Sequence, residues 1–104
     1  MEINIILDEV KRKISVLYGK RLRQIILYGS WARGDADDNS DIDLMIVLSG
    51  KVSPGKEIDR MIDTIYEIAL KHDTLIAIYP VSEKELQCSK GPVLLNVKRE
   101  GIAV

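Results

Sequence analysis

The apolar residues of this chain recur with two different periods, and these periods predict helices alternating with strands. Apolar positions spaced three or four residues apart over 2–18 and 54–72 are typical of helices with one buried face. Runs rich in apolar residues over 22–28, 41–48 and 74–80 instead favour strands. This order predicts an α+β fold, an α/β mixed sheet of three to four strands with helices packed on one face.

Turn and capping residues mark where several of these elements begin and end. Gly19 is expected to end the first helix, because glycine adopts the left-handed conformation of a helix C-terminus without strain. Ser53–Pro54 is a favourable helix start, with serine at the cap and proline in the first turn. Ser82 and Glu85 have the spacing of a capping box, which predicts a further short helix.

The last segment has a weaker pattern. Residues 90–104 favour a loop, a turn of helix and a final extended segment. The apolar end, 102–104, either completes the sheet of its own chain or pairs at a sheet edge with a second copy or a partner. Both alternatives, and with them the oligomeric state, are open from the sequence.

Length and composition restrict the class of protein. We expect the 104 residues to form one domain over 1–104, and the 46% hydrophobic share favours a folded chain. A net charge of −1 argues against a broad nucleic acid-binding surface. No apolar run reaches the ~20 residues that span a bilayer, so no membrane association is expected. One cysteine, Cys88, fits a reducing compartment, and we expect a cytoplasmic protein.

The stretch from 29 to 43 carries the candidate chemistry. Asp41 and Asp43 begin a predicted strand with one residue between them, so their side chains point to the same face with Cα atoms roughly 6.5–7 Å apart. Two neighbouring carboxylates repel each other unless a cation lies between them. Hard oxygen ligands of this kind suit Mg²⁺ or Mn²⁺, especially when nucleotide phosphates complete the coordination shell.

A turn after the preceding strand supplies an anion site. Gly29 permits a tight turn, and Ser30 is expected to cap a short helix whose first N–H groups suit a triphosphate. Arg33 pairs either with a phosphate or with the acidic loop over 35–38. Trp31 is expected to pack on a neighbour rather than to stack on a base. A metal on one strand and phosphate on the adjoining turn predict phosphoryl or nucleotidyl transfer.

This composite motif resembles a known family. Gly29–Ser30, ten residues, then Asp41-x-Asp43 is similar to the mark of the minimal nucleotidyltransferase domains of the DNA polymerase beta superfamily. The flanking segments 32–34 and 40–44 also match, and the resemblance extends loosely over nearly the whole chain, including 96–101. It implies the polymerase-beta-like nucleotidyltransferase fold.

The resemblance also implies an activity, with one departure from the family. It implies transfer of a nucleoside monophosphate from an NTP to a hydroxyl, with two Mg²⁺ ions held by Asp41 and Asp43. Gly29 and Ser30 would bind the β- and γ-phosphates. The superfamily usually supplies a third carboxylate from the next strand, but 74–79 contains no acid. Asp73 is the only local candidate for this metal ligand and base, and Ala77 stands where the acid is expected.

Minimal nucleotidyltransferases of this type are commonly encoded beside a HEPN-domain protein as a toxin–antitoxin pair. The resemblance therefore implies an antitoxin that moves AMP from ATP to a tyrosine of a HEPN RNase. The missing acid supports an alternative, a catalytically weak or inactive antitoxin that neutralises its HEPN partner by binding alone. A third alternative is transfer to a small antibiotic-like hydroxyl compound. No residue specifies the donor base or the acceptor.

Overall fold

A computed structural model describes residues 2–104 and contains a four-stranded mixed sheet in the order β3–β2–β1–β4. Its strands are β1 (Leu22–Tyr28), β2 (Ile42–Leu48), β3 (Ile76–Ser82) and β4 (Ile102–Ala103). The central strand β2 pairs antiparallel with β1 and parallel with β3. The two-residue strand β4 pairs antiparallel with β1, so the apolar C-terminal segment completes the sheet of its own chain.

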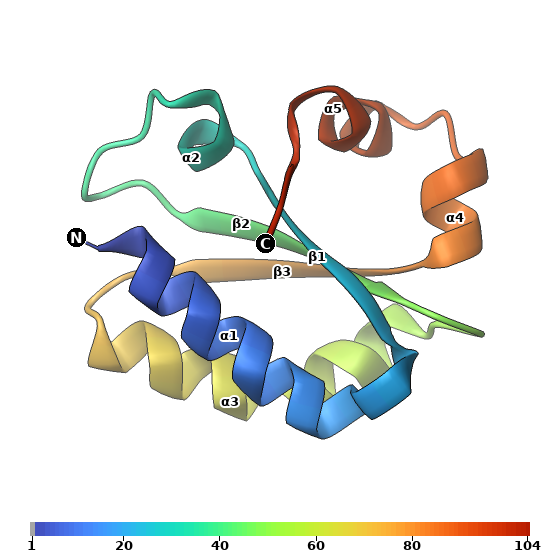
Figure 1. Ribbon diagram of the computed structural model, residues 1–104, viewed down its shortest axis with the longest axis horizontal. Helices are drawn as coiled ribbons and strands as arrows, with labels where there is room; N and C mark the ends of the chain where they lie inside the picture. Colours follow the sequence, from blue (N-terminus) through green and yellow to red (C-terminus); the bar gives the residue numbers. More distant parts are fainter. Residues whose placement is uncertain (1) are drawn as a thin grey trace.

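The helices lie on both faces of the sheet (Figure 1). They are α1 (Ile3–Tyr18), α2 (Ser30–Arg33), α3 (Pro54–Lys71), α4 (Glu83–Cys88) and α5 (Pro92–Glu100), with a short 3₁₀ helix over Gly19–Arg21. The long helices α1 and α3 cover one face, as the sequence predicts. The short helices α4 and α5 lie on the opposite face, where they form a second, thinner layer that the sequence pattern did not predict. Helix α2 lies at the end of β1, where Trp31 and Ala32 pack against the apolar cluster under α1 and α3.

Each face of the sheet has its own apolar cluster. The larger cluster lies under α1 and α3, and its fully buried members are Ile6, Val10, Ile14, Ile42, Leu44, Ile46, Leu48, Met61, Ile65 and Ile68. The smaller cluster lies under α4 and α5 and consists of Ile26, Met45, Val47, Val81, Leu94 and Val97. Successive strand residues point to opposite faces. Strand β2 therefore contributes to both clusters, which explains its continuous apolar sequence.

The third strand begins two residues later than the predicted range of 74–80 and ends two residues beyond it. Thr74 donates its backbone N–H to Ala69, so it belongs to the turn that ends α3. Parallel pairing with β2 continues to Ser82, opposite Leu48. The periodic pattern located the strand, but pairing with β2 set its ends.

The predicted capping signals are found, with one difference in detail. The Ser82 hydroxyl accepts a hydrogen bond from the Glu85 backbone N–H at 3.0 Å, so the capping box begins α4 as predicted. Ser53 and Pro54 begin α3 at the predicted place. There, however, the Ser53 side chain makes no cap hydrogen bond. Instead its backbone N–H donates to the Glu57 carboxylate at 3.3 Å.

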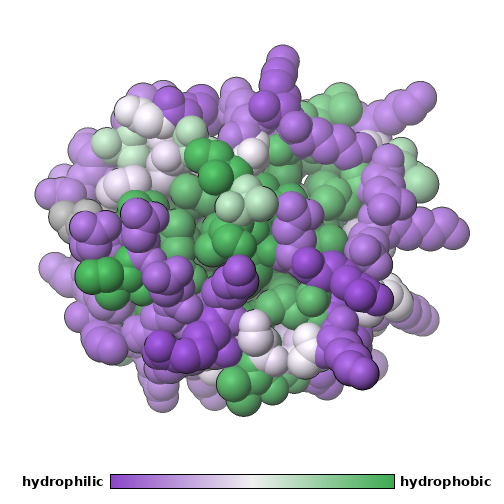
Figure 2. All heavy atoms as spheres, viewed as in Figure 1, coloured by the Kyte–Doolittle hydropathy of each residue, from purple (hydrophilic) through white to green (hydrophobic). Residues whose placement is uncertain are grey.

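The surface has an apolar region around the C-terminal strand. Figure 2 shows apolar residues gathered near the middle of the face that it presents. A hollow of about 520 Å³ lies between α1, α2 and β4 and is lined by Ile3, Asn4, Leu7, Asp8, Leu27, Trp31, Ile102, Ala103 and Val104. Of the helices formed within residues 2–104, none combines the length and apolar character needed to cross a membrane.

Candidate active site

The two aspartates of the motif lie at one end of the sheet, beside the end of β1. Asp43 is the second residue of β2 and pairs in register with Tyr28, the last residue of β1. Asp41 immediately precedes β2, so the strand starts one residue later than predicted. Ile42 is buried in the larger core cluster. By strand alternation, Asp41 and Asp43 therefore face the side that carries α5.

The charge environment of Asp43 fits a divalent cation. Partial burial raises the pKa of the Asp43 carboxyl above its ordinary value of 3.8, and the nearby negative charge of Asp41 raises it further, while Arg33 partly opposes this. The raised pKa indicates that nearby cations do not fully compensate the ionised carboxylate. A pair of hard oxygen donors that repel each other suits Mg²⁺ or Mn²⁺ as part of its coordination shell.

Gly29 brings the backbone of the turn against this carboxylate. Its φ is 74°, in the region that favours glycine, and a Cβ added there would overlap the Asp43 Oδ2 atom. A side chain at position 29 would therefore displace Asp43 or the turn. The phosphate-binding turn and the metal-binding carboxylate predicted from the sequence are thus in direct contact.

Ser30 is the first residue of α2, and the prediction that its side chain caps this helix is wrong. The cap is Gly29, whose carbonyl accepts the N–H groups of Ala32 and Arg33, each at 3.1 Å. The Ser30 hydroxyl makes no hydrogen bond to any residue over 2–104, so it remains free for a ligand. Trp31 packs against the larger core cluster and donates from Nε1 to the Ser40 carbonyl at 3.3 Å, as expected of a packing residue.

Arg33 makes two ion pairs beside the turn. Its Nε atom lies 3.3 Å from Asp35 Oδ2, which agrees with the alternative of a loop acid as partner. Its Nη1 atom lies 3.6 Å from Glu100 Oε2, at the end of α5, a contact that the sequence analysis missed. The hydrogen bond and charge of Asp35, with a smaller effect of Glu100, raise the pKa of Arg33 above its ordinary value.

A cleft separates α2 from α5 at this place. It has a volume of about 210 Å³ and is lined by Tyr28, Gly29, Arg33, Val93, Asn96 and Glu100. Burial raises the pKa of the Tyr28 hydroxyl, and the negative charge of Asp43 adds to the rise. The α5 side of the cleft had one signal in the sequence. Pro92 after Gly91 is a helix start, and the following helix carries Asn96 and Glu100 to this site.

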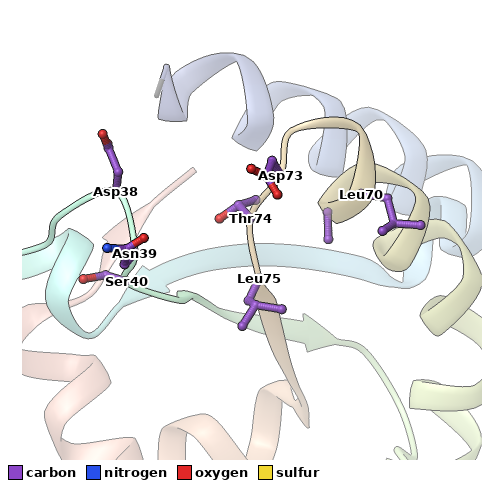
Figure 3. A pocket seen from close by; sticks show the side chains of 8 residues that line it. Asp38, Asn39, Ser40, Leu70, Asp73, Thr74 and Leu75 are labelled. Atoms are coloured by element: carbon purple, nitrogen blue, oxygen red, sulfur yellow. The ribbon is translucent and has the colours of Figure 1, made fainter.

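Asp73 lies apart from the aspartate pair, in the turn between α3 and β3, with a φ of 51°. It lines a cavity of about 310 Å³ together with Leu70, Thr74, Leu75 and the loop over 38–40 (Figure 3). Figure 3 shows that Asp73 and Asp38 project from separate loops on the two sides of this cavity. On β3, the residue that pairs in register with Asp43 is Ala77. Across residues 2–104, no three His, Cys, Asp or Glu side chains cluster as metal ligands would.

Comparison with known proteins identifies the family. The family model described as "Nucleotidyltransferase domain" matches residues 3–99, so the chain belongs to this family and is a nucleotidyltransferase. It is 39% identical over 77 residues to "Putative protein adenylyltransferase MJ0141" of Methanocaldococcus jannaschii, covering 74% of this chain and 77% of the relative. A second protein of that organism, "Putative protein adenylyltransferase MJ1305", is 36% identical over 99 residues, which cover 91% of this chain and 66% of the relative.

Solved structures confirm the fold. A crystal structure of a toxin–antitoxin with AMP-PNP is similar, with a TM-score of 0.63 and 18% identity over 90% of this chain and 68% of that chain. A structure described as a "putative nucleotidyltransferase" from Sulfolobus solfataricus has a TM-score of 0.57 and 20% identity, covering 94% of this chain and 75% of that chain. The predicted mixed sheet with packed helices is therefore the nucleotidyltransferase fold.

Proposed function

We propose that this protein is a Mg²⁺-dependent adenylyltransferase that moves AMP from ATP to a tyrosine of a HEPN RNase toxin in the cytoplasm and so acts as an antitoxin. One observation carries the proposal: the Gly29 backbone lies directly against the Asp43 carboxylate, which supports a phosphate-binding role for this turn beside a metal-binding role for the aspartate pair. Relatives named as protein adenylyltransferases support the reaction type. A structural neighbour described as a toxin–antitoxin with AMP-PNP supports the donor and the kind of partner.

The residues at the site have separate roles in this reaction. Asp41 and Asp43 would hold Mg²⁺, or Mn²⁺, which when bound neutralises phosphate charge and activates the attacking oxygen. The Ser30 hydroxyl and the first N–H groups of α2 bind the β- and γ-phosphates of ATP. Arg33 flanks them. The acceptor oxygen then forms a bond to the α-phosphorus, the bond from that phosphorus to the β-bridging oxygen breaks, and pyrophosphate leaves.

A base must remove the proton of the acceptor hydroxyl, and Asp73 is the candidate for this base. Its turn precedes β3, which is the strand that carries Ala77 opposite Asp43. The alternative function, neutralisation by binding alone, is supported by the same register, because a methyl group takes the place of a third carboxylate. In that case the chain would associate with a HEPN protein without modifying it.

The first test is the intact mass of a HEPN protein after incubation with this chain, ATP and Mg²⁺. We expect a gain of one or more AMP units with the wild type and none with Asp43→Ala, because that variant removes half of the metal-binding pair. An unchanged mass together with a stable complex would support the binding-only alternative. An unchanged mass without a complex would contradict both functions.

Two glycines provide a matched pair of variants for the same assay. Gly29, with φ 74° and ψ −154°, and Gly19, with φ 54° and ψ −126°, both lie outside the left-handed helical region in conformations that favour glycine, so an alanine costs backbone strain at either position. Only at Gly29 would the added Cβ overlap the Asp43 carboxylate, since no atom lies within 4 Å of a Cβ at Gly19. We expect Gly29→Ala to lose AMP transfer and Gly19→Ala to retain it. Equal effects of the two variants would contradict the proposed contact.

A further inference from the structure

The cleft between α2 and α5 is closed on one side by a contact between distant parts of the chain. Arg33 belongs to α2, in the motif at the end of β1, whereas Glu100 is the last residue of α5. Both residues line the 210 Å³ cleft, together with Gly29. Glu100 therefore stands beside the place where the β- and γ-phosphates of ATP are expected to bind.

Two carboxylates hold the Arg33 guanidinium from different directions. Asp35 lies 3.3 Å from Nε, and Glu100 lies 3.6 Å from Nη1. A guanidinium has five N–H donors in a rigid planar fork, so these two contacts leave the Nη2 donors free for a phosphate. The Arg33 side chain is 46% exposed, and an exposed arginine without such contacts would sample many rotamers.

The position of Glu100 is fixed by the packing of the residue that follows it. A Cβ at Gly101 would overlap the Val97 carbonyl oxygen and the Ile26 Cγ2 atom, so the end of α5 lies close against β1. Val104 donates its backbone N–H to Ile25 at 2.8 Å and holds the chain there. Asp35, in contrast, lies in an exposed loop with a side chain that is 61% exposed. Glu100 is therefore held in place more firmly than Asp35 beside the Arg33 guanidinium.

We propose that Glu100 is a positioning residue that orders the Arg33 guanidinium for the triphosphate of the nucleotide. The inference rests on the proposed function, in which ATP is the donor. Because Arg33 is already ordered before the nucleotide binds, less side-chain entropy is lost on binding. Removing the Glu100 charge is therefore expected to weaken ATP binding through Arg33, although Glu100 itself bears the same sign of charge as the phosphates.

The experiment measures the affinity for ATP with Mg²⁺ by isothermal titration calorimetry. The proteins are the wild type, Glu100→Gln, Arg33→Gln and the double variant. The matched control is Glu83→Gln, because Glu83 forms a comparably exposed ion pair with Arg23 at 3.5 Å, at the other end of the sheet. Thermal unfolding of each variant verifies that it is folded, and Glu100→Asp keeps the charge if the amide variant is unstable.

We expect Glu100→Gln to bind ATP about three- to tenfold more weakly, which is the effect of freeing one rotamer-rich side chain. Glu100→Asp should bind with intermediate affinity and Glu83→Gln like the wild type. Glu100→Gln should add nothing to Arg33→Gln. Unchanged or tighter binding by Glu100→Gln, or an equal loss in the Arg33→Gln background, would overturn the positioning role alone. A wild type that binds no ATP would overturn the proposed function as well.

Discussion

Asp43 is the residue at which the stability of the fold and the chemistry of the site oppose each other. Burial and the charge of Asp41 raise the pKa of its carboxyl, so the folded chain binds this proton more tightly than the unfolded chain does. Stability therefore falls as the pH rises from 3.8 through the pKa of the folded state. At neutral pH the ionised carboxylate carries this cost in full, and a bound cation would remove it.

We predict that Asp43→Asn raises the melting temperature of the metal-free protein at pH 7 by a few degrees. The difference should shrink as the pH falls below the ordinary range of carboxyl groups, because wild-type Asp43 is then neutral as well. Added Mg²⁺ should stabilise the wild type but not the variant, since a ligand stabilises only the state that binds it. Thermal unfolding from pH 3.5 to 7, with EDTA or Mg²⁺, measures both effects.

The control for this prediction is Asp63→Asn, at an exposed position of α3 on the opposite face of the sheet. It should change the melting temperature little and leave the Mg²⁺ response intact. A metal-free Asp43→Asn protein that unfolds at a lower temperature than the wild type at pH 7 would contradict the prediction.

Among the elements, the contact between the end of α1 and the start of α3 holds the larger layer together. The Tyr18 hydroxyl donates to Glu57 Oε1 at 2.9 Å, and the Ser53 N–H donates to Oε2 at 3.3 Å, so the buried carboxylate is satisfied on both oxygens. Burial and this hydrogen bond raise the pKa of Tyr18 to about 12. The guanidinium groups of Arg21 and Arg60 lie over its ring, at 5.7 and 5.4 Å from the centroid.

We predict that Tyr18→Phe lowers the free energy of unfolding by about 1–3 kcal/mol, because one oxygen of a buried carboxylate loses its donor. Urea denaturation measures the change. Tyr66→Phe is the matched control, since Tyr66 lies on α3 with 61% of its surface exposed. Loss of the Tyr66 hydroxyl should change the free energy of unfolding little. ATP affinity should be unchanged in both variants, because Tyr18 lies at the opposite end of β1 from Gly29. Equal stability of Tyr18→Phe and the wild type would refute the role of this contact.

The helices and strands that the sequence predicted best are those whose signals are local. The apolar period of α3 and the capping box of Ser82 and Glu85 act within one element, and both were located correctly. The ends of β3 depend on pairing with β2, so local apolar character placed the strand two residues too early. In α5 the buried Leu94 and Val97 are accompanied by the exposed Val93 and Leu95, so the sequence shows no clear apolar period that would indicate a nine-residue helix.

In the candidate site, too, the features set by local sequence were predicted and those set by tertiary packing were not. The spacing of Gly29 and Asp43 predicted a turn beside a carboxylate, because the two positions follow directly from adjoining strands. Glu100 lies far along the chain from Arg33, and only the packing of α5 on β1 brings them together. No pattern near either residue carries that information. The prediction that Ser30 caps α2 was wrong because the Gly29 carbonyl, rather than a side chain, accepts the N–H groups of Ala32 and Arg33.

The helix layers on the two faces of the sheet differ in thickness, and the candidate site lies on the side of the thinner layer. The larger apolar cluster, under α1 and α3, contains most of the fully buried side chains, whereas α2 contains no buried residue and α5 contains two. Segments with few buried contacts open at lower free energy than the core. The turn after β1 and helix α5, which form the walls of the cleft, are therefore the parts of the site that a ligand can order most, whereas Asp43 stands on the buried strand β2.

We predict that ATP with Mg²⁺ slows amide hydrogen exchange in 29–43 and 92–100 and leaves α1 and α3 unchanged. The first segment contains the turn and the aspartate pair, and the second forms the other wall of the cleft, so a nucleotide in the cleft orders both. Hydrogen exchange with mass spectrometry measures each segment, with Asp43→Ala as the control that should show little protection. Protection limited to 29–43 would exclude α5 from the binding site. Protection spread evenly over α1 and α3 would instead indicate general stabilisation, because those helices lie behind the sheet and contact no part of the cleft.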